Sequence, residues 1–211
     1  MRVMGGQWRG RRLVAVPGRT ARPSTGRVRE ALFSMLGSRV EAATVIDLCC
    51  GAGALGIEAL SRGAARAVFV DVSSRALEAT RANLEHCGAG PERWTLTRDD
   101  AVRWLERGAG AGRGVLVLAD PPYDSDLASR LVAALLRLAP GGPLLAAAIE
   151  HGASDGRVPA DPPAGSPWRL RCRRYRRAAL TLLEEASSEQ SPGAQPRALP
   201  SLHARAPRRP A

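Results

Sequence analysis

The tetrapeptide Asp120-Pro121-Pro122-Tyr123 follows an apolar run of strand length, Val115–Ala119, and it is the strongest chemical signal in the sequence. An exocyclic amine on a nucleobase is a poor nucleophile, because its lone pair is delocalised into the ring. Hydrogen-bond acceptors on its N–H bonds let the nitrogen pyramidalise as positive charge develops during attack on a sulfonium methyl. The Asp120 carboxylate and the Pro121 carbonyl can accept, Pro122 stiffens the loop, and Tyr123 offers a ring for base stacking. The loop therefore predicts methyl transfer to an amine, with these four residues in the catalytic role.

A glycine-rich segment, residues 51–56, connects an earlier apolar run to a helical pattern and reads Gly-Ala-Gly-Ala-Leu-Gly. Glycines allow close approach of the backbone to a ligand, and a helix N-terminus offers free N–H groups. Asp71 ends the next strand, 20 residues after Gly51, and its carboxylate suits a pair of ribose hydroxyls. This pattern alone fits a nicotinamide dinucleotide as well as S-adenosylmethionine.

Asp47 lies four residues before Gly51, at the mouth of the same loop. A dinucleotide would bring a pyrophosphate there, which a carboxylate repels, whereas S-adenosylmethionine brings an ammonium and a sulfonium, which it attracts. Asp47 could also simply cap the loop by hydrogen bonding. Together the two motifs favour S-adenosylmethionine as the cofactor, with Asp47, Gly51, Gly53 and Asp71 as binding residues.

The elements that must position these motifs alternate between strands and helices. Strands are expected at Thr44–Cys49, Ala67–Val72, Trp94–Thr97, Val115–Ala119 and Leu144–Ile149, with a closing pair at Trp168–Arg177 and Ala178–Glu185. Helices are expected from a Ser24 or Thr25 cap to Gly37, and at Leu55–Ser61, Ser74–His86, Ala101–Arg107 and Leu127–Leu138. Near-continuous apolar strands separated by helices predict an α/β fold whose parallel sheet is covered on both faces.

The charge of the 211 residues is distributed unevenly. Residues 1–29 carry eight arginines and no acid, residues 30–168 carry a net −4, and residues 169–211 carry a net +7. Base composition of the genome explains arginine without lysine, but it does not explain this segregation, so we expect a nucleic-acid partner. The expected contacts are Arg2, Arg9, Arg11, Arg12, Arg22, Arg29 and Arg173. A solvated edge strand is the alternative for the alternating arginines 169, 171 and 173.

Other classes of protein fit the sequence poorly. The chain has no apolar run of roughly 18–20 residues and no secretory h-region, so a cytoplasmic protein without a membrane span is expected. Its four cysteines form no CxxC pair and its three histidines form no cluster, so neither disulfides nor a metal site are expected. Cys49 and Cys50 are interpreted as packing residues, because a catalytic thiolate is needed on the substrate side. His151 is expected at the surface.

The Asp-Pro-Pro-Tyr loop is the signature of S-adenosylmethionine-dependent amino-methyltransferases acting on adenine N6, cytosine N4, guanine N2 or glutamine. More narrowly, residues 1–185 resemble the RsmD family, bacterial enzymes that methylate guanine N2 at position 966 of 16S ribosomal RNA. The matching stretches are residues 2–11, 22–33 and 45–64, the 120–123 loop, Glu150-His151 and the strand around Tyr175.

The resemblance implies a Rossmann-like methyltransferase fold with seven strands, six of them parallel and one antiparallel near the edge. Asp47, Gly51 and Gly53 would line the methionine end of the cofactor, Asp71 would bind the ribose, and Asp100 with Ala101 would flank the adenine. Residues 120–123 would hold a guanine of 16S ribosomal RNA, either free or in an assembling small subunit, and the protein would act as a monomer. The expected organisation is a basic N-terminal arm or hairpin (residues 1–24), a methyltransferase domain (25–185) and a disordered basic tail (186–211).

Two positions depart from the family pattern. Cys49-Cys50 stands where Phe-Ala is usual, and Tyr175-Arg176-Arg177-Ala178 stands where Tyr-Gly-x-Thr is usual. Two alternatives also remain open: an RNA-binding module that has the fold without turnover, and an amino-methyltransferase that acts on DNA or protein.

Overall fold

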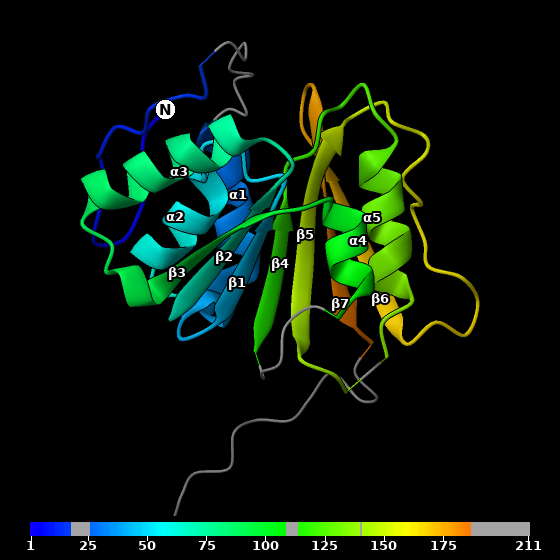
Figure 1. Cartoon of the computed structure of the whole chain (residues 1–211). Coiled ribbons are helices and arrows are strands. Elements are labelled where there is room, and N and C mark those ends of the chain that lie inside the picture. The colour runs from blue at the N-terminus through cyan, green and yellow to red at the C-terminus, as the bar shows by residue number, and fades with distance from the viewer. Residues whose placement is uncertain (18–25, 109–113, 140, 187–211) are drawn as a thin grey trace, which may run out of the picture.

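The computed structural model describes residues 1–17, 26–108, 114–139 and 141–186. Its centre is one sheet of seven strands in the order β3-β2-β1-β4-β5-β7-β6 (Figure 1). The strands are β1 (Thr44–Leu48), β2 (Arg66–Asp71), β3 (Trp94–Arg98), β4 (Val115–Ala119), β5 (Leu144–Gly152), β6 (Trp168–Arg174) and β7 (Ala178–Glu185). Strands β1 to β5 pair in parallel, and β7 is antiparallel to both of its neighbours. Six strands therefore run one way and one runs against them, which confirms the expected fold class.

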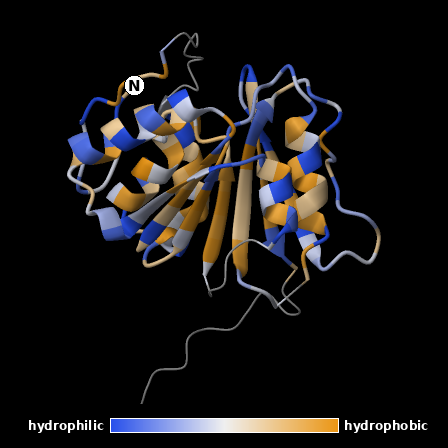
Figure 2. Cartoon of the chain, in the orientation of Figure 1, coloured by the Kyte–Doolittle hydropathy of each residue, from blue (hydrophilic) through white to orange (hydrophobic). Residues whose placement is uncertain are grey.

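Helices cover both faces of the sheet, as expected. Helices α1 (Gly26–Leu36), α2 (Ala54–Ser61) and α3 (Ser74–Cys87) lie on one face, and α4 (Ala101–Glu106) and α5 (Leu127–Leu136) lie on the other (Figure 1). Two short 3-10 helices, Gly37–Val40 and Pro91–Arg93, complete the elements. The central strands are the most apolar part of the chain (Figure 2), and every residue of β4 is buried.

Small differences from the expected boundaries have local causes. The strand expected at Trp168–Arg177 ends at Arg174, because Tyr175 donates its backbone N–H to the Ala178 carbonyl (2.7 Å) and closes a turn. The helix expected to reach Leu138 ends at Leu136. The expected caps Ser24 and Thr25, and the tail from residue 187 onward, lie outside the described residues.

The N-terminal residues form a hairpin (residues 1–13) that packs on the outside of α2 and α3. Its two halves pair through an antiparallel bridge between Arg2 and Arg12. Val3, Trp8 and Leu13 are buried in the same core cluster as α1 and α2. Of the two forms expected for this segment, an arm or a hairpin, residues 1–13 therefore adopt the hairpin, and it is packed into the domain.

A buried carboxylate and a close backbone contact hold this hairpin. Both Glu58 oxygens accept backbone N–H groups of the hairpin, from Met4 (2.7 Å) and Gly5 (2.8 Å). At Gly6 the backbone has φ +74°, and a Cβ there would fall on the carbonyl group of Ser61 at the end of α2. Glycine is therefore required at Gly6 both for its dihedral angle and for space.

No helix among the described residues is both long enough and apolar enough to cross a bilayer.

Candidate cofactor and substrate site

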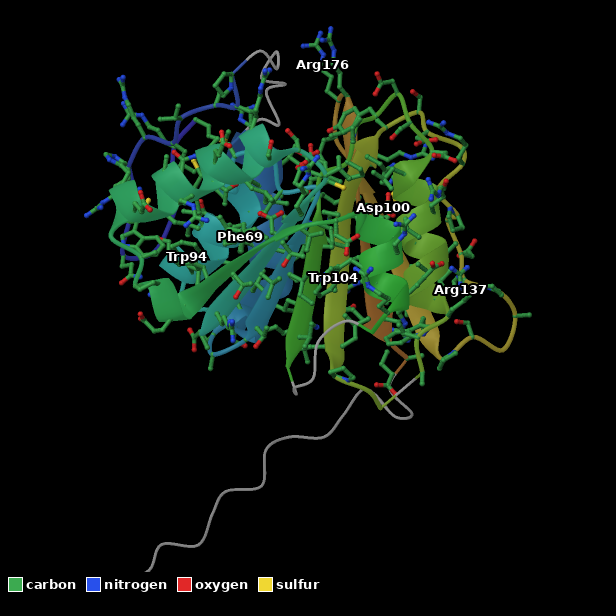
Figure 3. All side chains as sticks on the ribbon, viewed as in Figure 1. Phe69, Trp94, Asp100, Trp104, Arg137 and Arg176 are labelled. Atoms are coloured by element: carbon green, nitrogen blue, oxygen red, sulfur yellow. The ribbon has the colours of Figure 1, made fainter. Side chains whose placement is uncertain are left out.

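Four carboxylates converge at the carboxyl edge of the parallel strands. Asp47 and Asp71 lie in β1 and β2, Asp100 follows β3, and Asp120 follows β4. Burial is the main reason that the pKa of the Cys49 thiol rises to about 12, and the charges of all four carboxylates add to that rise. The four carboxylates therefore lie at or just after the carboxyl ends of four adjacent strands, β3-β2-β1-β4. Figure 3 labels Asp100 at this edge.

The glycine loop is shaped by close packing. Gly53 has φ +78°, and a Cβ there would lie 2.7 Å from the Thr80 methyl group on α3. A Cβ at Gly56 would overlap the ring of Phe69 on β2, so this glycine lets α2 pack closely on the sheet. Gly51 donates its N–H to Asp71 Oδ2 (3.0 Å), which ties the loop to the end of β2.

Asp47 is 1% exposed and accepts the backbone N–H of Gly56 in the first turn of α2 (2.8 Å). Burial raises its pKa well above the ordinary value, the Gly56 bond opposes that rise, and the charges of Asp120 and Asp71 add to it. The capping role left open in the sequence is therefore present. The electrostatic role remains a prediction, since a bound cation would offset the cost of the charged form.

Asp71 and Asp100 also bind the backbone. Asp71 Oδ1 accepts the N–H of Ser73 (2.9 Å), and Asp100 Oδ1 accepts the N–H of Arg103 (2.9 Å) as the N-cap of α4. Ala101 is buried beside it. An ionised carboxylate has about four lone-pair sites. Both groups can therefore accept ligand hydroxyl or amino groups as well, and this cofactor role remains a prediction.

Residues 120–123, for which a substrate role is predicted and which we call the substrate loop, are anchored by a contact that the sequence did not reveal. The Tyr123 hydroxyl donates to Glu150 Oε1 on β5 (2.5 Å), and the Tyr123 ring lies over Gly152, where an added Cβ would be 3.7 Å from it. Glu150 is 1% exposed, and burial raises its pKa although the Tyr123 bond and the Arg29 charge oppose the shift. Glu150 thus fixes the ring proposed for base stacking.

Arg29 is the clearest correction to the expected nucleic-acid surface, because its side chain is buried rather than available to a phosphate. It is 4% exposed, its Nε lies 3.6 Å from Glu58 Oε2, and its Nη2 donates to the Arg2 carbonyl. Burial lowers its pKa, and Glu58, Glu150 and Asp120 oppose that shift. Arg29, Phe33 and Leu36 follow helical spacing along the buried side of α1, so the sequence contained a signal for this burial.

The other predicted arginines lie where solvent reaches them. Arg2, Arg9, Arg11, Arg12 and Arg173 are all exposed. Arg2 donates to the Gly10 carbonyl (2.9 Å) and Arg11 to the His86 carbonyl on α3 (2.7 Å). Arg22 lies outside the described residues.

Cys49, Cys50 and His151 have packing or hydrogen-bonding roles near the four carboxylates. Burial, reinforced by Asp47 and Asp71, raises the pKa of Cys50 as well, so both neighbouring thiols stay protonated and pack as expected. The surface position expected for His151 is wrong, because its Nε2 lies 2.9 Å from the Thr181 hydroxyl in a buried pair. Within the described ranges, no three side chains are grouped to hold a metal ion.

Comparison with known proteins agrees with this geometry. The family model described as "Conserved hypothetical protein 95" matches residues 1–152. The chain belongs to this family, the RsmD family. Over 124 residues it is 39% identical to "Putative rRNA methyltransferase YlbH" of Bacillus subtilis, covering 58% of this chain and 67% of the relative.

Two further similar proteins also carry methyltransferase names. Over 123 residues the chain is 37% identical to "Ribosomal RNA small subunit methyltransferase D" of Escherichia coli, covering 58% of this chain and 60% of that protein. A solved structure, "Putative methyltransferase yhhF from Escherichia coli", is 31% identical with a TM-score of 0.70, covering 88% of this chain and 97% of that one. The fold is therefore that of a methyltransferase over nearly the whole described chain.

Proposed function

We propose that this RsmD-family protein transfers a methyl group from S-adenosylmethionine to the exocyclic N2 amine of a guanine in 16S ribosomal RNA. Position 966 is the target that the family resemblance implies. The observation that carries the proposal is the convergence of Asp47, Asp71, Asp100 and Asp120 at one sheet edge, with Asp120 opening the Asp-Pro-Pro-Tyr loop. This edge is where open α/β sheets bind ligands. The named functions of two relatives, on ribosomal RNA, support the same substrate class.

The carboxylates fit S-adenosylmethionine better than a dinucleotide. A region of negative potential attracts the ammonium and the sulfonium of this cofactor and repels a pyrophosphate. Asp47 would act on the cationic end, Asp71 on the ribose hydroxyls, and Asp100 with Ala101 on the adenine. When bound, S-adenosylmethionine supplies an electrophilic methyl group on a sulfonium.

The residues of the substrate loop then have distinct tasks. The Asp120 carboxylate and the Pro121 carbonyl accept the N–H bonds of the guanine amine, so positive charge on nitrogen is stabilised as it develops. The Tyr123 ring stacks on the base, and its bond to Glu150 restricts rotation of that ring. Guanine N2 lies on the Watson–Crick edge, so the base must be unpaired or flipped out of a helix.

The exposed arginines of the N-terminal hairpin are the expected contacts for the RNA partner. Exposed arginines of the hairpin, among them Arg9 and Arg12, would contact RNA phosphates outside the acidic region. We expect the protein to act as a monomer in the cytoplasm on ribosomal RNA or on an assembling small subunit.

The test is the Asp120→Ala variant, assayed with labelled S-adenosylmethionine on naked 16S RNA and on small ribosomal subunits. We expect methyl transfer to be lost while the Kd for the cofactor changes little, because the carboxylate acts on the amine. Nucleoside analysis of RNA methylated by the unmodified protein should give N2-methylguanosine. N6-methyladenosine would overturn the guanine assignment, methylated DNA or protein would overturn the RNA assignment, and binding without turnover would reduce the protein to an RNA-binding module.

A further inference from the structure

The turn between β6 and β7 projects from the same sheet edge as the carboxylates. Backbone hydrogen bonds fix its path: Tyr175 donates to the Ala178 carbonyl (2.7 Å), and Ala153 donates to the Arg177 carbonyl (3.1 Å). In the sheet register, Arg174 is opposite Ala179, and Ala179 is opposite His151 near the end of β5. Figure 3 shows Arg176 protruding at this edge, far from Arg137. The turn is therefore a fixed structure beside the substrate loop.

Three exposed arginines, Arg174, Arg176 and Arg177, define what we call the basic turn. None of them forms an ion pair with any residue that the structure describes. Other exposed arginines of this half of the chain do, since Arg171 pairs with Glu184 (3.2 Å) and Arg137 with Glu106 (3.0 Å). The charge of the basic turn is thus not neutralised within the described chain.

The Tyr175 side chain attaches the basic turn to the hydrophobic core. Its side chain is half-buried and packs against the core cluster that contains α1, while the arginines on both sides of it face solvent. The charge of Arg174 also reaches β5, on the other side of β7, because it contributes to lowering the pKa of His151, although burial is the larger cause. Strands β7 and β6 lie two and three strand spacings from β4, which is about 10 and 14 Å. The basic turn therefore lies at the same sheet edge as Asp120, outside its acidic region.

We propose that the basic turn binds the phosphates of the RNA nucleotides that flank the target base. This inference rests on the proposed function and adds a specific surface to it. The acidic region suits a cationic cofactor but repels the RNA backbone, so arginines at its rim offset that repulsion where the strand must pass. Planar guanidinium groups match phosphate oxygens in a bidentate arrangement.

The experiment compares two triple variants of the full chain with equal loss of charge. The test variant is Arg174→Gln, Arg176→Gln and Arg177→Gln, and the control is Arg66→Gln, Arg103→Gln and Arg137→Gln. The control residues are exposed and lie at the start of β2, on α4 and at the end of α5, outside the expected RNA contacts. Binding to a 16S RNA transcript is measured over a range of salt concentrations, and cofactor binding is measured in parallel.

We expect the test variant to bind RNA more weakly, with a log–log salt slope smaller by up to about 2, because each lost phosphate contact removes about 0.7. The control should keep the slope of the unmodified protein, and both variants should bind the cofactor equally well. Equal salt slopes in all three proteins would overturn the role of the basic turn. The proposed function is tested separately, because it depends on whether the unmodified protein methylates the RNA. A test variant that binds the transcript normally but fails on assembled subunits would also overturn it, since the basic turn would then contact a ribosomal protein.

Discussion

The bond between Tyr123 and Glu150 can be tested by replacing Tyr123 with Phe, which removes one oxygen atom and keeps the ring for stacking. Glu150 is almost fully buried, so the variant leaves its carboxylate without that partner. A hydrogen bond to a charged group contributes about 1.5–3 kcal/mol. For a domain of this size that loss corresponds to a decrease in Tm of roughly 3–12 °C.

The destabilisation should depend on pH with a defined sign. Burial already raises the pKa of Glu150, so its contribution to stability is fully present at low pH and is lost as the pH rises through that raised pKa. The Tyr123 bond counteracts the rise, and its removal raises the pKa further. The difference in stability between Tyr123→Phe and the unmodified protein should therefore be small in acid and larger once Glu150 is charged.

A double-mutant cycle with Tyr123→Phe and Glu150→Gln, followed by denaturant unfolding at pH 5 and pH 8, measures this coupling. We expect a coupling free energy of about 1.5–3 kcal/mol at pH 8 that shrinks at pH 5. Methyl transfer should fall less in Tyr123→Phe than in Tyr123→Ala, because only the second variant loses the stacking ring. Coupling under about 0.5 kcal/mol at both pH values would refute this role of Glu150.

Three further predictions concern the cofactor region and the hairpin. Asp71→Asn should raise the Kd for S-adenosylmethionine more than tenfold in calorimetry, since bonds to a charged acceptor contribute about 1.5–3 kcal/mol each; an unchanged Kd would mean that Asp71 does not face the ribose. Asp47→Asn should raise the Tm of the ligand-free protein at pH 8, because a neutral amide avoids the cost that burial places on the charged form of this carboxyl, and it should weaken cofactor binding. Gly6→Ala should lower Tm more than Gly10→Ala, because both have positive φ but only Gly6 faces the Ser61 carbonyl. Equal Tm values for the two glycine variants would contradict that contact.

The sheet and its two ligand loops could be predicted because their signals are local. Val115–Ala119 is an unbroken apolar run, and the glycines and Asp71 lie at fixed spacings around a strand–helix junction. The pairing of Arg29 with Glu58 could not be predicted in the same way, because the Glu58 carboxylate also binds a hairpin that folds back from the start of the chain. A basic, glycine-rich segment has the composition of a free arm, and only the spacing of its few apolar residues, such as Trp8, indicates packing.

The strand order has a consequence for synthesis of the chain. Strand β5 pairs on its outer side with β7, and β6, which is made before β7, lies outermost. When β6 has just emerged from the translating ribosome, the apolar strand β5 still presents an unpaired edge, and such edges pair readily with neighbouring chains. Nascent chains stalled between β6 and β7 should therefore aggregate or recruit chaperones, whereas chains released after residue 186 should not.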